Sequence, residues 1–199
     1  MSPKLGVEPV RRDQILNAAF EVIADRSLEA TRMRDIASAA GVSHPSVHYY
    51  FDTKDQLIVA LLDRLLEQFL SGYEERLADA GDPLAKLRML LEQQKGLIEH
   101  RKDHLEVYYD FWVQATKRPI ARRKIRGMYS SWRGTINRIL DDGVRQGQFR
   151  ADRVPQAEFL LVSLFQGAAL QSIVDPANVD LGAYFAQVDK FIVHFLCHE

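Results

Sequence analysis

Apolar residues recur along this chain of 199 residues at the three- and four-residue spacing of amphipathic helices, without the alternation typical of strands. Prolines and glycines, as in Gly81-Asp82-Pro83 and Arg118-Pro119, interrupt the pattern and mark helix ends. The sequence has no internal repeat. We therefore predict an all-α fold of nine helices, over about residues 11–25, 31–40, 43–50, 53–80, 83–102, 103–118, 119–145, 155–175 and 181–197.

The segment 31–57, TRMRDIASAAGVSHPSVHYYFDTKDQL, predicts two short helices joined by a glycine turn. We expect Thr31 to cap the first helix, and Gly41 to end it in the left-handed conformation. Ser43 is expected to cap the second helix, with Pro45 in its first turn. This second helix shows hydroxyl, imidazole and phenol groups, so it gains little from burial. A helix-turn-helix whose second helix lies in the DNA major groove explains this polarity.

This segment resembles the DNA-binding domain of the TetR family of bacterial repressors over about residues 11–60. The matching positions are Thr31, Arg34, Ile36, Ala37, Ala40-Gly41-Val42-Ser43, Tyr50-Phe51, Lys54 and Leu57, preceded by a similar first helix at 14–20. The resemblance implies a three-helix DNA-binding domain at 1–55 and an effector-binding and dimerisation domain at 56–199. It also implies a base or phosphate contact from Arg34, and DNA-backbone clamps at Tyr50 and Lys54.

The residues expected at the DNA lie on or next to the two short helices. They are Arg32, Arg34, Ser43, His44, Pro45, Ser46, His48, Tyr49, Tyr50 and Lys54. Pro45 and His48 depart from the commonest family pattern, which bears on base preference. Residues 1–60 contain seven basic and eight acidic side chains, so the domain lacks the basic surface usual in DNA-binding proteins. We therefore expect weak non-specific binding and a requirement for two subunits.

The segment 159–170 is apolar on almost every side, and the last predicted helix is apolar on more than one face. Such helices need cover on all sides, which a second subunit supplies. We predict a twofold homodimer whose recognition helices lie roughly 34 Å apart and read a palindrome. An internal core helix is the alternative. The expected interface residues are Leu161, Leu164, Ala168, Phe185, Val188, Ile192 and Phe195.

The C-terminal region resembles the choline-repressor-like branch of the family through Phe111-Trp112, Arg133, Asp141-Asp142-Gly143 and Gly147-Gln148-Phe149. This resemblance names no ligand. Aromatic residues concentrate here and would suit a pocket for a small organic effector, although for any single ring a place in the ordinary core is the favoured interpretation. The candidate lining is Phe69, Tyr108, Phe111, Trp112, Met128, Trp132, Phe165 and Gln166.

Eight basic residues and no acidic residue lie between positions 117 and 138. They form either a solvated helix face or a surface that attracts an anionic effector, such as a carboxylate or an acyl-CoA. All six histidines fall in pairs four residues apart. The pair His44/His48 raises the possibility of pH-dependent DNA binding. His194 and His198, with Cys197, form a weak metal candidate without a nearby carboxylate, so no metal and no cofactor are expected.

Other features of the sequence limit which classes of function are expected. No phosphate-binding glycine loop and no Gly-x-Ser-x-Gly motif is present, so we do not expect an enzyme. One cysteine, the absence of a signal peptide in residues 1–10 and the polar interruptions of 159–174 favour a cytoplasmic protein without a membrane partner. The expected function is a ligand-responsive repressor. The alternatives are an effector-dependent activator, and an adaptor or sensor that does not bind an operator.

Overall fold

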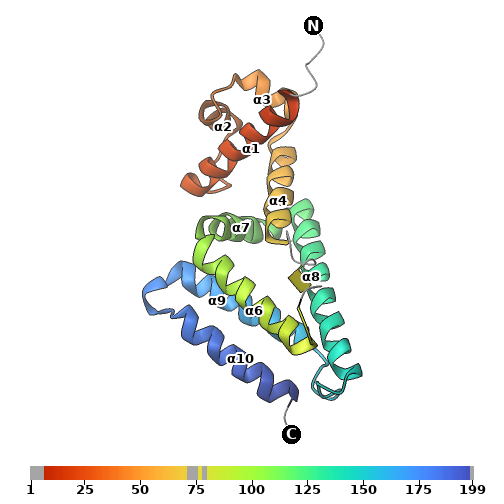
Figure 1. Cartoon of the computed structure of the whole chain (residues 1–199). Helices are drawn as coiled ribbons and strands as arrows, with labels where there is room; N and C mark the ends of the chain where they lie inside the picture. Colours follow the sequence, from red (N-terminus) through yellow and green to blue (C-terminus); the bar gives the residue numbers. More distant parts are fainter. Residues whose placement is uncertain (1–6, 71–75, 78–79, 198–199) are drawn as a thin grey trace. The chain divides into compact units, whose positions relative to one another are not determined.

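The computed structural model describes residues 7–70, 76–77 and 80–197. Within these ranges the chain forms nine α-helices, one short 3-10 helix and no strand, which confirms the predicted all-α class (Figure 1). The last part of the helix predicted over 53–80 lies largely outside the described residues. The elements are α1 (Val7–Arg26), α2 (Met33–Ala39), α3 (His44–Tyr50), α4 (Lys54–Leu70), α6 (Pro83–His100), α7 (Lys102–Ala115), α8 (Pro119–Arg145), α9 (Ala157–Val174), η1 (Pro176–Asn178) and α10 (Leu181–Cys197).

The chain folds into two compact units. The first comprises the described residues up to Gln68 together with Glu106–Ile125, and the second comprises Phe69–Leu105 together with the described residues from Arg126 onward. Helices α4, α7 and α8 contribute residues to both units. The division at residue 55 that we predicted from the sequence stays a prediction.

In the first unit, α1 packs against α2, and α2 packs against α3 (Figure 1). Ile15, Ile36 and Val47, one from each helix, are almost completely buried and belong to the core of this unit. Gly41 has a φ of 62°, and the Val42 N–H donates to the Ala37 carbonyl at 3.0 Å, so the turn forms as expected.

The start of α2 differs from the prediction. Thr31 does not cap this helix, because its hydroxyl donates to the Ser27 carbonyl at 2.7 Å. Arg32 is the N-cap residue, and its backbone N–H donates to the Asp35 carboxylate at 3.1 Å. The reason is local: Ser27, with a φ of 72°, turns the chain so that its carbonyl faces Thr31.

In the second unit, α6, α9 and α10 lie side by side (Figure 1). Asp82 caps α6 by accepting from the Ala85 N–H at 2.9 Å. The Arg88 guanidinium lies 2.7 Å from the Asp189 carboxylate and links α6 to α10. Gly147 ends α8 in the left-handed conformation, with a φ of 71°.

Most of the residues expected at the dimer interface are covered within the protomer itself. Five of its seven residues are buried inside the protomer, namely Leu161, Ala168, Phe185, Val188 and Ile192, while Leu164 and Phe195 are half-buried. Other large apolar residues of α9 and α10 are exposed instead: Phe159, Leu160, Leu170, Val174 and Phe191. Because α9 is apolar on almost every side, its residue pattern does not indicate which face is buried inside the protomer.

Helix α9 is also the one helix of the described residues that is long and apolar enough to cross a membrane, with 18 residues and a mean hydropathy of 1.5. The polar interruptions of 159–174, from which we predicted that the chain has no membrane partner, therefore do not exclude a span by length and composition. One such helix is weak evidence for a membrane span, because core helices of soluble proteins have the same composition.

Candidate nucleic-acid interface and effector region

Helix α3 is fixed from both its start and its inner face. The Ser43 hydroxyl accepts from the Ser46 N–H at 3.2 Å, which confirms Ser43 as the cap. Val47 is completely buried on the inner face of the helix, and α3 packs against α2. Pro45 and Tyr49 lie about 160° around the helix from Val47, so they point away from the core. Tyr49 is 66% exposed, and its ring contacts the Tyr50 ring edge to face, with centroids 5.1 Å apart.

Two imidazole rings lie together on α3. The ring centroids of His44 and His48 are 4.6 Å apart, with planes at 80°. The His48 Nδ1 lies 3.2 Å from the Asp52 carbonyl oxygen. A carbonyl oxygen only accepts hydrogen bonds, so this Nδ1 bears the proton and Nε2 of the neutral ring is an acceptor. Such an acceptor suits the amino group of adenine or cytosine in the major groove.

The remaining predicted DNA residues also lie near α2 and α3. Arg32 and Arg34 are exposed at the start of α2, and Tyr50 is half-buried at the end of α3. An open groove of about 510 Å³ lies between the start of α1 and the end of α3, lined by Pro9, Arg12, Asp13, Tyr49 and Tyr50. The Arg12 guanidinium lies 5.3 Å from the Phe51 ring centroid. Sequence analysis did not identify Arg12, because a single arginine on a helix gives no local signal.

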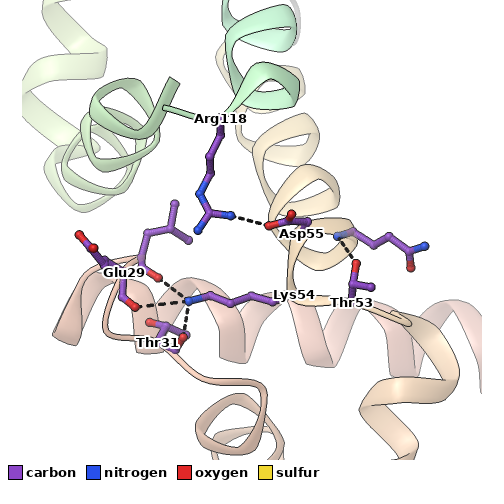
Figure 2. Close-up of polar contacts among 8 residues, drawn as sticks. Glu29, Thr31, Thr53, Lys54, Asp55 and Arg118 are labelled. Atoms are coloured by element: carbon purple, nitrogen blue, oxygen red, sulfur yellow. Dashed lines mark hydrogen bonds and ion pairs between the residues drawn. The ribbon is translucent and has the colours of Figure 1, made fainter. Parts of the chain in front are cut away.

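Lys54 does not have the position expected of a DNA-backbone clamp. Its ammonium donates to the backbone carbonyl of Leu28 at 2.8 Å and to that of Thr31, and lies 3.5 Å from the Glu29 carbonyl (Figure 2). Burial lowers the pKa of Lys54, and the nearby guanidinium of Arg118 lowers it further. In this structure the ammonium is therefore directed at protein carbonyls rather than outward.

Part of the basic run at 117–138 is paired within the first unit. Arg118 forms an ion pair with Asp55 (Figure 2), and the Lys124 Nζ lies 2.8 Å from the Asp63 carboxylate. Arg122 donates to the Ala115 carbonyl at 3.0 Å. Arg123 and Arg126 are exposed. Some basic residues of this run thus stabilise the fold, whereas Arg123 and Arg126 place positive charge at the surface.

The candidate effector residues fall into two groups. Tyr108 and Phe111 are buried in the first unit, whereas Trp112 is 42% exposed there. Phe69, Met128, Trp132, Phe165 and Gln166 belong to the second unit.

The second group contains a stack of rings. The centroids of Trp132 and Phe165 are 5.7 Å apart, and those of Phe165 and Phe185 are 6.4 Å apart. Tyr129, which we did not predict, forms a hydrogen bond with Gln166. The ring contacts and this hydrogen bond all lie within the second unit.

The described residues contain no group of three or more histidine, cysteine, aspartate or glutamate side chains that could hold a metal ion. His198, a member of the weak C-terminal candidate, lies outside the described residues. Burial raises the pKa of the Cys197 thiol, which makes it a poorer metal ligand and a poorer nucleophile.

Comparisons with known proteins match both parts of the chain. Residues 15–61 match the family model of bacterial regulatory proteins of the tetR family, and residues 83–196 match the model of the BetI-type transcriptional repressor C-terminal domain. The HTH-type transcriptional repressor KstR2 of Mycolicibacterium smegmatis is 32% identical over 156 residues, which cover 76% of this chain and 74% of that protein.

Two solved structures have a similar fold. A transcriptional regulator from Saccharomonospora viridis in complex with choline has a TM-score of 0.85 and 26% identity, and the match covers 94% of this chain and 98% of that one. The regulator FadR of Bacillus subtilis in complex with stearoyl-CoA has a TM-score of 0.77 and 21% identity, with coverages of 90% and 96%, and supports the fold alone.

The helix-turn-helix geometry and these matches confirm the resemblance seen in the sequence, and with it the expectation that the protein is not an enzyme. The chain belongs to the TetR family of helix-turn-helix transcriptional regulators and is a DNA-binding repressor with a ligand-binding C-terminal domain of the BetI type.

Proposed function

We propose that this repressor binds a palindromic operator as a homodimer and leaves it when a small-molecule effector binds the C-terminal domain. The main support is the geometry of α3, which is capped by Ser43, anchored by Val47 and polar on its outward side. A helix of seven residues reads only a few base pairs, so specific binding needs two copies in register.

The second copy is expected to cover the exposed apolar face of α9 and α10. Leu160, Ser163, Gly167, Leu170 and Val174 follow one another at intervals of three and four residues, so they share one side of α9. Three of these five are large and apolar, and exposed in the protomer. Contiguous apolar surface of this kind marks an interaction site in most soluble proteins.

We infer that the effector is anionic or largely hydrophobic, such as an acyl-CoA, rather than a small cation. Arg123 and Arg126 are exposed within a stretch that contains no acidic residue, and they would repel a cation such as choline. The stacked rings of Trp132 and Phe165 suit an apolar chain or ring system.

Operator binding is tested by selecting bound sequences from a random duplex pool with the purified protein at ~150 mM salt, where non-specific phosphate binding is weak. A palindromic consensus is expected, and the Arg34→Ala and Tyr49→Ala variants should lose it. No enrichment would contradict the proposal and favour an adaptor or sensor. A consensus bound only in the presence of a ligand would instead indicate an effector-dependent activator.

The effector class is tested on the selected duplex with two probes, stearoyl-CoA and choline. We expect stearoyl-CoA to release the DNA, and the double variant Arg123→Glu/Arg126→Glu to weaken that response. Lys190→Glu, which changes an exposed charge of α10, is the control. Release by choline alone would overturn the inference about charge. The protein is expected to act in the cytoplasm, where its operator would be.

A further inference from the structure

The loop between α1 and α2 is held by two charged side chains that come from other helices. From α4, the Lys54 ammonium donates to the carbonyls of Leu28 and Thr31 (Figure 2). From α7, the Asp110 carboxylate accepts a hydrogen bond from the Leu28 N–H. The amide nitrogen and the carbonyl oxygen of Leu28 are thus bound by opposite charges.

These contacts satisfy backbone groups that no helix pairs. Helix α1 ends at Arg26, and Leu28 is completely buried directly after it. The last carbonyls of a helix and the loop after it lack intrahelical donors, and a cation near them is stabilised by the helix dipole. Hydrogen bonds to a charged partner are about twice as strong as neutral ones. The loop is therefore fixed by residues remote in sequence rather than by its own turn.

The loop leads directly into the DNA-binding helices. Met33 begins α2 only five residues after Leu28, and α2 packs against α3. Arg118, which precedes α8, pairs with Asp55 beside Lys54, so the chain segment after α7 is also joined to the start of α4 (Figure 2). A displacement of α7 would act on the loop and on α4 together.

Helix α7 also carries two candidate effector residues, Tyr108 and Phe111, both buried. Around a helix, Asp110 lies about 160° from Tyr108 and about 100° from Phe111. Asp110, which anchors the α1–α2 loop through Leu28, and these two buried rings therefore lie on different sides of the same helix. An α-helix of 14 residues moves as a rigid unit, so a displacement of α7 at Tyr108 and Phe111 also displaces Asp110.

We propose that Asp110 and Lys54 are positioning residues for operator binding: they contact no DNA, and together they hold the α1–α2 loop so that the placement of α2 and α3 depends on α7. This proposal rests on the proposed operator binding. It replaces the role of a phosphate clamp for Lys54. An effector that moves α7 would break the Asp110–Leu28 hydrogen bond and release the loop.

The hydrogen bond between Asp110 and the Leu28 N–H is tested first without DNA, by amide hydrogen exchange of Leu28 in the full chain. Loss of a charge-assisted hydrogen bond should raise the exchange rate on the order of ten- to a hundredfold in Asp110→Ala. Asp110→Asn retains an acceptor oxygen and should restore part of the protection. Asp141→Asn, which neutralises an exposed acid of α8, is the matched control and should leave Leu28 unchanged. Unchanged exchange in Asp110→Ala would overturn the proposal.

The second test separates positioning from phosphate contact. Operator affinity of Lys54→Met, which keeps the aliphatic stem, is measured against salt concentration on the duplex selected by the parent protein. A positioning residue predicts weaker binding with an unchanged slope of log affinity against log salt. Loss of a phosphate contact would reduce that slope by about 0.9 and would overturn the proposal for Lys54. If Lys54→Met does not fold, the same measurement on Asp110→Asn tests the positioning role of Asp110, which requires weaker operator binding with an unchanged slope.

The two proposals fail in different ways. If no duplex is selected, operator binding is refuted, and the Leu28 exchange in Asp110→Ala still decides whether the anchor exists. If DNA is bound and neither Asp110→Ala nor Lys54→Met weakens binding, operator binding stands and the positioning role is refuted.

Discussion

Leu170 lies in the middle of the exposed apolar face of α9, with 49% of its surface accessible in the protomer. Complete burial of a leucine side chain contributes about 1.5–3 kcal/mol, so covering the exposed half contributes about 1 kcal/mol per copy. In a twofold dimer each residue of the face counts twice, and Leu170→Ala should therefore cost about 2 kcal/mol. That corresponds to roughly thirtyfold weaker dimerisation.

Leu170→Asp should have a larger effect, because a carboxylate in an apolar interface also loses its hydration. That penalty is several kcal/mol per ion, so dimerisation should weaken by a factor on the order of a thousand or more. Sedimentation equilibrium over the micromolar range measures both variants against the parent. Val113→Asp is the matched control, since Val113 is 52% exposed on α7. A parent protein that stays monomeric, or a Leu170→Asp variant that dimerises like the parent, would refute the interface.

Two further predictions concern stability and its dependence on pH. A Cβ added at Gly143 would lie 1.9 Å from the Phe149 ring, so Gly143→Ala should expel this buried ring and cost about 3 kcal/mol in urea unfolding; equal stability would show that the packing gives way. Hydrogen bonds from the backbone N–H of the first turn of α6, and then from a glutamine side chain, lower the pKa of Asp82 below its ordinary 3.8. The stabilisation of the folded state by the Asp82 carboxylate is therefore complete above pH 3.8 and is lost as the pH falls through the lower folded-state pKa. The difference in unfolding free energy between the parent and Asp82→Ala should become smaller in that range.

Much of the DNA-binding part could be predicted from the sequence because its determinants are local. The Ser43 cap, the left-handed Gly41 and the apolar spacing that buries Val47 all act within a few residues. The predicted cap at Thr31 was wrong for an equally local reason. Ser27 has a positive φ, and its carbonyl oxygen accepts a hydrogen bond from the Thr31 hydroxyl. Such competition between neighbouring acceptors is decided by backbone geometry that residue types alone do not specify.

The remaining features needed the tertiary structure. Lys54 donates to a carbonyl 26 residues earlier, and Asp110 accepts from an amide 82 residues earlier, so neither partner can be read from local spacing. The same holds for α9, where the sequence determined that the helix is apolar on all sides. Only packing against neighbouring helices decided that Phe165, which stacks with Trp132 and Phe185, lies inside and that Leu170 lies outside. The sequence by itself determined the helices, the turn and the family. The tertiary structure decided which charges meet and which apolar face stays open, because both depend on contacts between residues far apart in the chain.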